Sequence, residues 1–270
     1  MPNAKDAHNL VQHKILMLGD TGSGKSTQIL TLPGKKFVYI FDSNALLSLR
    51  GYDVDYEEYL PSTLGMAVKS LSKDVKGDMA KSRSSDVYQK FETSFNERLT
   101  NGFFDQYDWV CFDGATTLLD LIMDRVLTIN GRFGTWPHED DYGPQMIAFT
   151  NIVRNMVAMG KSVYMTGHLE VRQNKVTKKV KTQPMMTGRL TAKIPLLFSD
   201  IFGTDVDIDA KGKPVYRIQT VPDQDNSIVR CSIKGLEPFE DVTIDWTQPV
   251  VGQGLGGILN WERKQLGMAA

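Results

Sequence analysis

The sequence predicts an α/β domain built on a mostly parallel sheet, and three observations favour this class. Short apolar runs alternate along the chain with longer segments of helical periodicity. A glycine-rich loop directly follows the first apolar run. The later runs end in polar or ionisable residues, at the position where open α/β sheets place their ligands.

The composition is that of an ordinary globular domain and restricts the function classes. The 270 residues carry 31 basic and 32 acidic side chains, a net charge of −1, which excludes a broadly basic protein that coats nucleic acid. No apolar run reaches the roughly 18 residues of a membrane span, and residues 1–13 lack a signal-peptide pattern. We therefore expect a cytoplasmic protein that makes no membrane contact. The two cysteines, Cys111 and Cys231, indicate neither a disulfide framework nor a zinc site.

Four apolar runs predict the parallel strands. They span residues 14–18, 37–41, 109–112 and 162–166, and each is short and bounded by turn residues. Between them, a short helix is expected over 26–32, before Pro33-Gly34. Apolar residues that recur every three or four positions predict longer helices over 87–99, 118–129 and 146–157.

The pattern changes beyond Pro195. Residues 205–208 and 215–221 are predicted to form a hairpin, and 227–233 is a further strand candidate. The stretch from residue 245 is rich in glycine without clear periodicity. We therefore expect an N-terminal segment (1–13), one domain (14–244) and a loosely packed tail (245–270).

The phosphate-binding candidate lies between the first strand and the first helix. It comprises Gly19, Asp20, Thr21, Gly22, Ser23, Gly24, Lys25, Ser26 and Thr27, and it matches G-x-x-x-x-G-K-[ST]. Glycines let the backbone N–H groups of such a loop converge on phosphate oxygens, and the N-terminal end of the next helix adds positive potential. Lys25 is expected to contact the β- and γ-phosphates, and the Ser26 hydroxyl is expected to bind Mg²⁺. The loop predicts a nucleoside-triphosphate site.

Asp113 is the candidate for a second group, after Ser26, that binds the Mg²⁺ ion. It follows four apolar residues, as a magnesium-binding carboxylate at a strand end requires. The alternative is a plain turn at Asp113-Gly114. Asp42 is the rival carboxylate, and we rank it lower because its strand follows the phosphate-loop helix immediately.

Three segments resemble the phage and bacterial AAA-type ATPases with a RecA-like core, a group that includes phage single-strand-annealing recombinases. They are KILMLGDTGSGKSTQILTLPGKKFVYIFDSN, YDWVCFDGATTLLDLI and GKSVYMTGHLE. The similarity covers residues 14–238 and implies a RecA-like P-loop NTPase core with a small β-rich C-terminal extension. It also implies ATP and Mg²⁺ as cofactors, a strand inserted between the phosphate-loop strand and the Asp113 strand, and a homo-oligomeric ring or filament. For a phage protein the compartment would be the host cytoplasm.

The resemblance also assigns roles at two further strand ends. His168 falls where the family carries a polar sensor of the γ-phosphate, with Thr166 as the alternative; otherwise His168 is simply bonded to backbone. Asn44 stands where the family has a glutamate that polarises the attacking water. Because asparagine cannot accept the proton at neutral pH, hydrolysis is expected to be slow, or its base is Asp42, Glu57 or Glu58.

A basic segment follows the sensor strand. Its cations are Arg172, Lys175, Lys178, Lys179 and Lys181, with no acid between them. The resemblance implies that this segment faces single-stranded DNA, where it would give salt-dependent, sequence-independent binding. The alternative is a solvated hairpin tip, and the absence of an aromatic residue for base stacking counts against DNA.

Other charged residues have less specific interpretations. Asp200, Asp205, Asp207 and Asp209 predict an acidic patch facing water or a neighbouring subunit. The candidates for a cation donated to a neighbour's ATP are Arg189, Lys193, Arg230 and Lys234. The loop 136–141, which includes His138, is interpreted as a charged surface loop rather than a metal site.

Two functions remain in competition. The first is an ATPase that acts on single-stranded DNA in recombination or strand annealing. The second is a nucleotide-binding assembly protein with weak hydrolysis and no DNA contact. A small-molecule kinase is disfavoured because no arginine-rich lid is evident.

Overall fold

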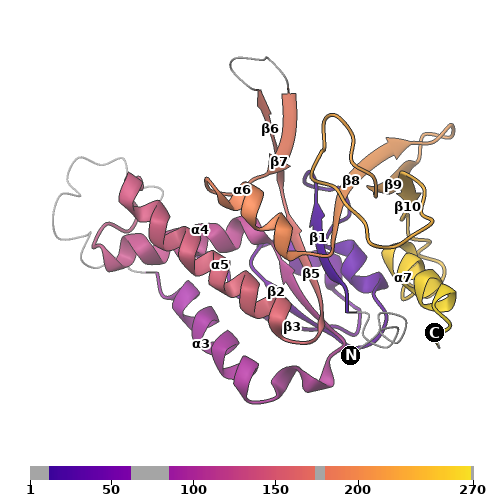
Figure 1. The fold of residues 1–270 in the computed structure, drawn as a ribbon. Helices are drawn as coiled ribbons and strands as arrows, with labels where there is room; N and C mark the ends of the chain where they lie inside the picture. The colour runs from indigo at the N-terminus through magenta and orange to yellow at the C-terminus, as the bar shows by residue number, and fades with distance from the viewer. Residues whose placement is uncertain (1–11, 62–84, 174–179, 269–270) are drawn as a thin grey trace, which may run out of the picture.

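A computed structural model describes residues 12–61, 85–173 and 180–268, and a central sheet of eight strands organises them (Figure 1). The strand order is β10-β9-β8-β1-β5-β4-β2-β3. The bounds are β1 (Lys14–Leu18), β2 (Lys36–Ile40), β3 (Asp55–Glu58), β4 (Trp109–Asp113), β5 (Ser162–Gly167), β8 (Asp200–Ile208), β9 (Pro214–Gln219) and β10 (Phe239–Asp241). All pairings from β8 through to β3 are parallel, and β9 and β10 are antiparallel. The predicted fold class is confirmed, and β5 is the strand inserted between β1 and β4.

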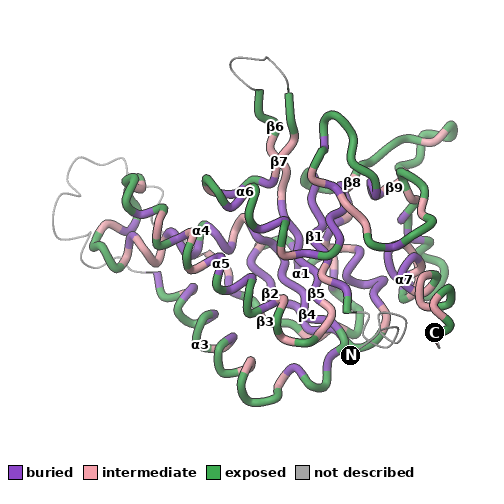
Figure 2. The backbone as a smooth tube through the Cα atoms, in the orientation of Figure 1, coloured by how far each residue is buried: buried purple, intermediate pink, exposed green. Residues whose placement is uncertain are grey.

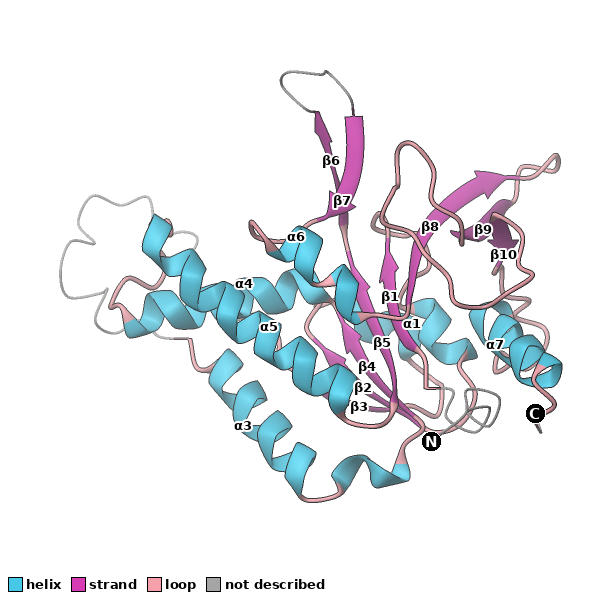
Figure 3. Ribbon diagram, in the orientation of Figure 1, coloured by secondary structure: helices cyan, strands magenta, loops and turns pink. Residues whose placement is uncertain are grey.

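Helices cover both faces of this sheet (Figure 3). The α-helices are α1 (Ala45–Leu49), α3 (Val87–Thr100), α4 (Ala115–Ile129), α5 (Tyr142–Ala158), α6 (Leu190–Lys193) and α7 (Gly254–Gln265). Short 3₁₀ helices span Thr27–Thr31, Phe103–Gln106, Glu139–Asp141 and Pro195–Leu197. The three longer helices of the sequence prediction correspond to α3, α4 and α5 and are confirmed. A separate hairpin of β6 (Leu169–Gln173) and β7 (Val180–Pro184) projects from the body (Figure 1).

The central strands β1, β2, β4 and β5 are largely apolar because each of their two sides contacts a different core. In β1, Leu16 and Leu18 join the cluster that contains α3, α4 and α5, whereas Ile15 and Met17 join the cluster that contains α7 and the 27–31 turn. The same alternation holds in β4. Successive side chains point to opposite faces of a strand, so a sheet covered on both faces needs uninterrupted apolar runs. Figure 2 shows these strands as the buried centre of the molecule.

One sequence prediction of local structure is wrong, and another is confirmed only in part. Residues 227–233 do not form a strand; they contribute one isolated bridge, between Ile201 and Arg230. The Asp200 carboxylate accepts hydrogen bonds from the Ser232 backbone N–H at 2.6 Å and from its hydroxyl at 2.8 Å, which diverts that backbone from strand pairing. The short helix expected over 26–32 is present as a five-residue 3₁₀ helix, Thr27–Thr31, which is too short to supply the expected helix-dipole potential.

The prediction of a loosely packed tail is also wrong for residues 254–265, because they form α7. Leu255, Ile258 and Leu259 recur at helical spacing and are buried in the second core cluster. The helix lies so close to the 27–31 turn that a side chain on Gly256 would clash with the Thr31 carbonyl oxygen. The Gly256 N–H donates to the Thr31 hydroxyl at 3.0 Å. Gly256, one of the glycines that hide the helical pattern in the sequence, permits this contact.

Within the described ranges 12–61, 85–173 and 180–268, no helix is long and apolar enough to cross a membrane.

The Gly256 contact generates a prediction about stability. Gly256→Ala places a methyl group against backbone that cannot move aside, so we expect it to lower the free energy of unfolding by about 2 kcal/mol. Gly143→Ala is the control, because Gly143 lies in the first turn of α5 and a methyl group there would meet no other atom, so we expect no loss. Urea denaturation of the three proteins checks this. Equal midpoints for Gly256→Ala and the unsubstituted protein would contradict it.

Candidate functional site

The phosphate loop leaves the C-terminal end of β1 and curls back over it. Gly22 and Gly24 have φ angles of 80° and 86°, in the left-handed region that other residues rarely adopt. The Ser23 hydroxyl fixes the turn by lying 2.7 Å from the Asp20 carbonyl oxygen and 2.6 Å from the Thr204 hydroxyl of β8. The loop is therefore held by its own backbone and by the neighbouring strand.

Lys25 lies inside this loop rather than in solvent. Its Nζ donates to the carbonyl oxygens of Gly19, at 3.0 Å, and Asp20, at 2.6 Å. Burial lowers the pKa of Lys25, and the nearby carboxylates, of which Asp113 acts most strongly, oppose that shift. An ammonium group held this way is positioned to exchange carbonyl partners for phosphate oxygens.

Asp113 is fully buried at the C-terminal end of β4. Its Oδ1 accepts a hydrogen bond of 2.5 Å from the Thr166 hydroxyl of β5, whereas its Oδ2 has no hydrogen-bond partner. Burial raises the pKa of Asp113, and the hydroxyls of Thr166 and Ser26 act in the opposite direction. A buried carboxylate oxygen without a partner beside a serine hydroxyl fits a hard cation, so Ser26 and Asp113 form a suitable Mg²⁺ site.

Asp42 is held next to Asp113 by contacts between β2 and β4. The Phe41 N–H donates to the Asp113 carbonyl at 2.6 Å, and the Thr117 hydroxyl of α4 donates to the Asp42 carboxylate. A side chain on Gly114 would come within 2.8 Å of Asp42 Oδ2, so it would displace this carboxylate. The two carboxylates therefore converge on one cleft.

These groups line a cleft of about 620 Å³. Its lining residues are Thr21, Gly22, Lys25, Ser26, Phe41, Asp42, Ser43, Asn44, Ala45, Ser48, Pro61, Asp113, Thr117 and His168. The structure thus brings together the sequence candidates Lys25, Ser26, Asp42, Asn44, Asp113 and His168. Three strand ends and the phosphate loop meet here because all of these strands are parallel.

Comparison with known proteins agrees with this arrangement. A family model described as an AAA domain matches residues 12–224, which include every strand from β1 to β9. The chain belongs to this AAA-domain family. Its fold is that of a RecA-like P-loop NTPase, a class of nucleotide-binding proteins.

Two solved structures to which this AAA domain is similar are distant from it in sequence. The flagellar accessory protein FlaH from Methanocaldococcus jannaschii is 11% identical, with 87% of each chain covered and a TM-score of 0.39. A KaiC-like protein from Pyrococcus horikoshii OT3 is 10% identical, with 77% of each chain covered and a TM-score of 0.40. No curated protein matches the sequence.

The two sensor candidates have different surroundings in this AAA domain. The buried Thr166 hydroxyl is committed to Asp113, so Thr166 acts on the carboxylate rather than directly on a phosphate. The half-buried His168 side chain lines the cleft, and its backbone N–H donates to the Thr116 hydroxyl at 3.4 Å. His168 is therefore the better placed of the two for contact with a γ-phosphate.

The alternative bases Glu57 and Glu58 lie elsewhere. Both belong to β3 and line a separate cavity beside α3. Glu57 forms an ion pair with Arg98 of α3. Asp42 is thus the one acid among the three proposed bases that lines the phosphate cleft.

The candidate trans-acting cations differ in their availability. Arg230 donates to the backbone carbonyls of Pro195 and Phe198, which occupies its guanidinium within its own chain. Arg189 and Lys193 are exposed at α6, and Lys234 is exposed in a turn. The geometry disfavours Arg230 and leaves the other three.

The predicted acidic patch is divided in the structure. Asp200 is fully buried, and hydrogen bonds from His13, Ser199 and Ser232 keep its pKa below the ordinary value despite the burial. Asp205 and Asp207 are exposed on β8, whereas Asp209 accepts the backbone N–H groups of Lys211 and Lys213 in the β8–β9 turn. The patch is therefore smaller than predicted, because Asp200 does not belong to it.

The 136–141 loop does not gather a metal site. Asp141 is buried and accepts hydrogen bonds from Asn130, Arg132 and the His138 backbone N–H. No group of three or more His, Cys, Asp or Glu residues able to hold a metal occurs in the part of the chain that the structure describes.

The described ends of the basic segment belong to the β6–β7 hairpin, whose two strands were not predicted. Arg172 and Lys181 are exposed and directly opposite each other in the ladder. Arg172 also forms an ion pair of 2.9 Å with Glu170. Lys175, Lys178 and Lys179 lie outside the described residues.

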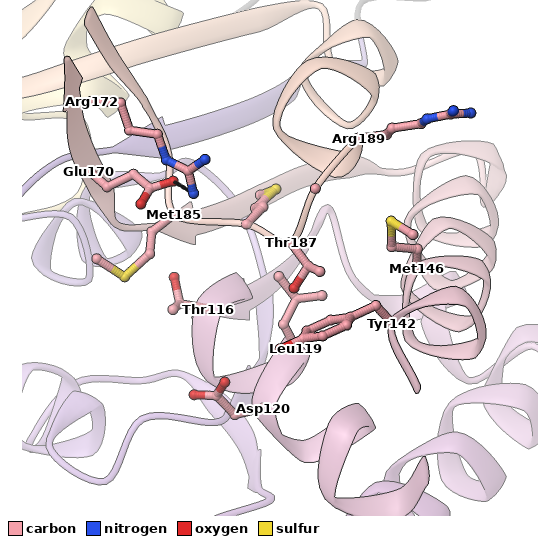
Figure 4. A pocket seen from close by; sticks show the side chains of 12 residues that line it. Thr116, Leu119, Asp120, Tyr142, Met146, Glu170, Arg172, Met185, Thr187 and Arg189 are labelled. Carbon is pink, nitrogen blue, oxygen red and sulfur yellow. Dashed lines mark ion pairs between the residues drawn. The ribbon is translucent and has the colours of Figure 1, made fainter. Parts of the chain in front are cut away.

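A cavity of about 680 Å³ separates the base of this hairpin from α4 and α5 (Figure 4). Its lining residues are Thr116, Leu119, Asp120, Tyr142, Met146, Glu170, Arg172, Met185, Met186, Thr187, Gly188 and Arg189. The Arg189 side chain points away from the cavity (Figure 4). Thr116 lines this cavity while the next residue, Thr117, lines the phosphate cleft. One turn of α4 thus separates the two spaces.

The Thr166–Asp113 hydrogen bond generates a prediction about metal binding. Thr166→Val removes the hydroxyl that orients the carboxylate, and loss of such a supporting group typically weakens metal affinity by about 10- to 100-fold. We expect ATP binding with Mg²⁺ to weaken and ATP binding in excess EDTA to stay unchanged, as measured by calorimetry. Thr150→Val is the control, because the buried Thr150 hydroxyl donates to a carbonyl within α5. Equal weakening with and without Mg²⁺ would contradict the assignment.

Proposed function

We propose that this chain is an Mg²⁺-dependent ATPase that assembles into a homo-oligomer and acts on single-stranded DNA, in recombination or strand annealing. The observation that carries the nucleotide part is the buried pair of Lys25 and Asp113 at the end of β1 and β4. The phosphate loop and Lys25 would bind the β- and γ-phosphates, and Ser26 and Asp113 would hold Mg²⁺. The cation, when bound, would neutralise charge that develops on the phosphate oxygens.

The candidate residues for water activation, Asp42 and Asn44, line the same cleft. Asp42 can accept a proton, and its carboxylate is oriented by Thr117. Asn44 makes no capping bond to α1, although it stands at that helix's N-cap, so its amide is able to orient a water. This pair supports hydrolysis that is slower than with a glutamate at position 44.

The hairpin supports the DNA part of the proposal. It begins one residue after His168, so contact between His168 and a γ-phosphate would act directly on the start of β6. Arg172 and Lys181 form a cationic rung on its exposed part. Repeated in each subunit of an oligomer, such hairpins would bind a strand together although each binds weakly.

The second candidate function is a nucleotide-binding assembly protein with weak hydrolysis and no DNA contact. Asn44 favours it, because the cleft carries an amide where a proton acceptor would speed hydrolysis. The ion pair that Arg172 forms with Glu170 also reduces the charge free for phosphates. In that function, bound ATP would stabilise the contact between subunits.

Charge reversal in the hairpin tests the DNA part. We expect Arg172→Glu with Lys181→Glu, and separately Lys178→Glu with Lys179→Glu, to weaken binding of a single-stranded oligonucleotide at low salt by at least about tenfold. Arg154→Glu with Lys264→Glu removes as many exposed cations outside the hairpin and is the control. Fluorescence anisotropy measures binding, and ATPase rate and assembly mass are followed alongside. If the unsubstituted protein binds no oligonucleotide and DNA does not stimulate its ATPase, the second function replaces the first.

Substitution at Asn44 tests the account of slow hydrolysis. Asn44→Glu supplies a carboxylate in the cleft, and general-base catalysis typically contributes 10²-fold or more, so we expect kcat to rise by about tenfold or more. Asn44→Gln has the same side-chain length without a base and should leave kcat low. Steady-state ATP hydrolysis with saturating Mg²⁺ measures both. Equal rates for the two variants would show that position 44 does not limit turnover.

A further inference from the structure

A second cavity of about 620 Å³ adjoins the phosphate loop, and Asp113 does not line it. Its lining residues are Gly22, Gly24, Lys25, Ser26, Thr27, Gln28, Ser48, Lys213, Pro214, Tyr216, Val242, Thr243, Ile244, Asp245, Trp246 and Thr247. Four of them, Gly22, Lys25, Ser26 and Ser48, also line the phosphate cleft. A ligand with phosphates on the loop therefore has room to continue directly into this second cavity.

The far wall of the cavity is aromatic and apolar. Trp246 is 59% exposed, and its nearest ring neighbour is Tyr52, with the ring centres 6.3 Å apart. Tyr216 lies under the loop, where a side chain on Gly24 would come within 3.2 Å of its ring. Ile244, a residue of the second core cluster that is 8% exposed, also lines the cavity. Large, partly exposed aromatic faces beside a phosphate site are suited to a planar base.

The segment 242–247 is fixed to the phosphate-loop region by hydrogen bonds. The buried Gln28, just after the loop, donates to the Val242 carbonyl at 2.8 Å and accepts the Leu255 N–H of α7 at 2.9 Å. On the other side, the Tyr216 N–H donates to the Thr243 hydroxyl at 2.8 Å. The wall of the cavity is thus tied to the strand and the turn that border the phosphate loop.

Trp246 itself stands in a turn that is stabilised on both sides. The Asp245 carboxylate accepts the Thr247 N–H at 2.9 Å and the Thr247 hydroxyl at 2.7 Å, and these bonds lower the pKa of Asp245. Gln253 Nε2 donates to the Asp245 carbonyl at 3.0 Å. The indole is therefore presented on an ordered backbone, so stacking on it costs little conformational entropy.

We propose that Trp246, with Tyr216 and Ile244, forms the subsite for the base of the bound nucleoside triphosphate. This inference rests on the proposed nucleotide binding at the phosphate loop and adds the residues that recognise the non-phosphate part. The family match ends at residue 224, so the match does not include the segment 242–247. The residues after 224, here called the C-terminal extension, thus supply part of the base subsite. The AAA domain supplies the loop that binds the phosphates.

The test compares ATP with inorganic tripolyphosphate, which carries the phosphates without a base or ribose. We expect Trp246→Ala to weaken ATP binding by on the order of tenfold and to leave tripolyphosphate binding unchanged, because base–aromatic stacking is lost and the phosphate loop is intact. Trp246→Phe should recover most of the ATP affinity. Trp136→Ala is the matched control, because Trp136 is 90% exposed and lies in the loop before α5. Calorimetry measures each affinity.

Tryptophan fluorescence gives a second readout that does not depend on an unstable variant. ATP should change the emission of the unsubstituted protein and of Trp136→Phe, and this change should be absent in Trp246→Phe. Unaltered ATP affinity in Trp246→Ala, equal loss of ATP and tripolyphosphate binding, or an unaltered ATP-dependent change in Trp246→Phe would overturn the base subsite. Failure of the proposed function looks different, because Lys25→Ala would then bind both ligands as tightly as the unsubstituted protein.

Discussion

The hydrogen bond from Thr166 to Asp113 is the contact on which the arrangement of the site depends. It joins the ends of β5 and β4, and β5 itself pairs with β1, which carries the phosphate loop. The register of these three strands therefore sets the position of the carboxylate relative to Lys25. Burial disfavours the charged form of both groups, since it lowers the pKa of Lys25 and raises that of Asp113. A cleft that holds both groups away from water is suited to a ligand that carries negative phosphates together with a divalent cation.

The position of the phosphate loop also depends on the C-terminal residues, through the second core cluster. Gln28 and Thr31 lie in the turn that follows the phosphate loop, and both hydrogen-bond to the start of α7. The turn is a short 3₁₀ helix, so its own backbone bonds stabilise it little. Packing of α7 against it supplies apolar burial that the short turn lacks. The C-terminal extension is in this sense part of the phosphate site, although it lies beyond the family match.

The central strands could be predicted from the sequence, whereas the edge strand β3 and the C-terminal helix α7 could not. The strands β1, β2, β4 and β5 could be predicted because burial on both faces leaves uninterrupted apolar runs, and each run ended at a chemically informative residue. Strand β3 was missed because its DYEE sequence is half exposed and carries no such run. The helix α7 was missed because glycine has low helix propensity, whereas its role here is set by the close approach of Gly256 to Thr31. For the site, Lys25 and Asp113 follow from local patterns, but Thr117, Gln28 and Trp246 act through tertiary contacts that no short motif encodes.

The two sides of the phosphate loop suggest how binding and response are divided in this molecule. The side with Trp246 is held in place by hydrogen bonds that Gln28, the Tyr216 backbone N–H and Gln253 donate to the segment 242–247. The other side ends at His168, from which the β6–β7 hairpin projects from the body (Figure 1), and the Thr182 N–H of β7 donates to the Asp225 carbonyl at 2.8 Å. On one side of a bound γ-phosphate the protein would therefore present the hydrogen-bonded segment 242–247, and on the other side the projecting β6–β7 hairpin. If His168 contacts the γ-phosphate as proposed, the hairpin is the element that a change in nucleotide state would reach first, because β6 begins at the next residue. This asymmetry holds whether the hairpin contacts DNA or a neighbouring subunit.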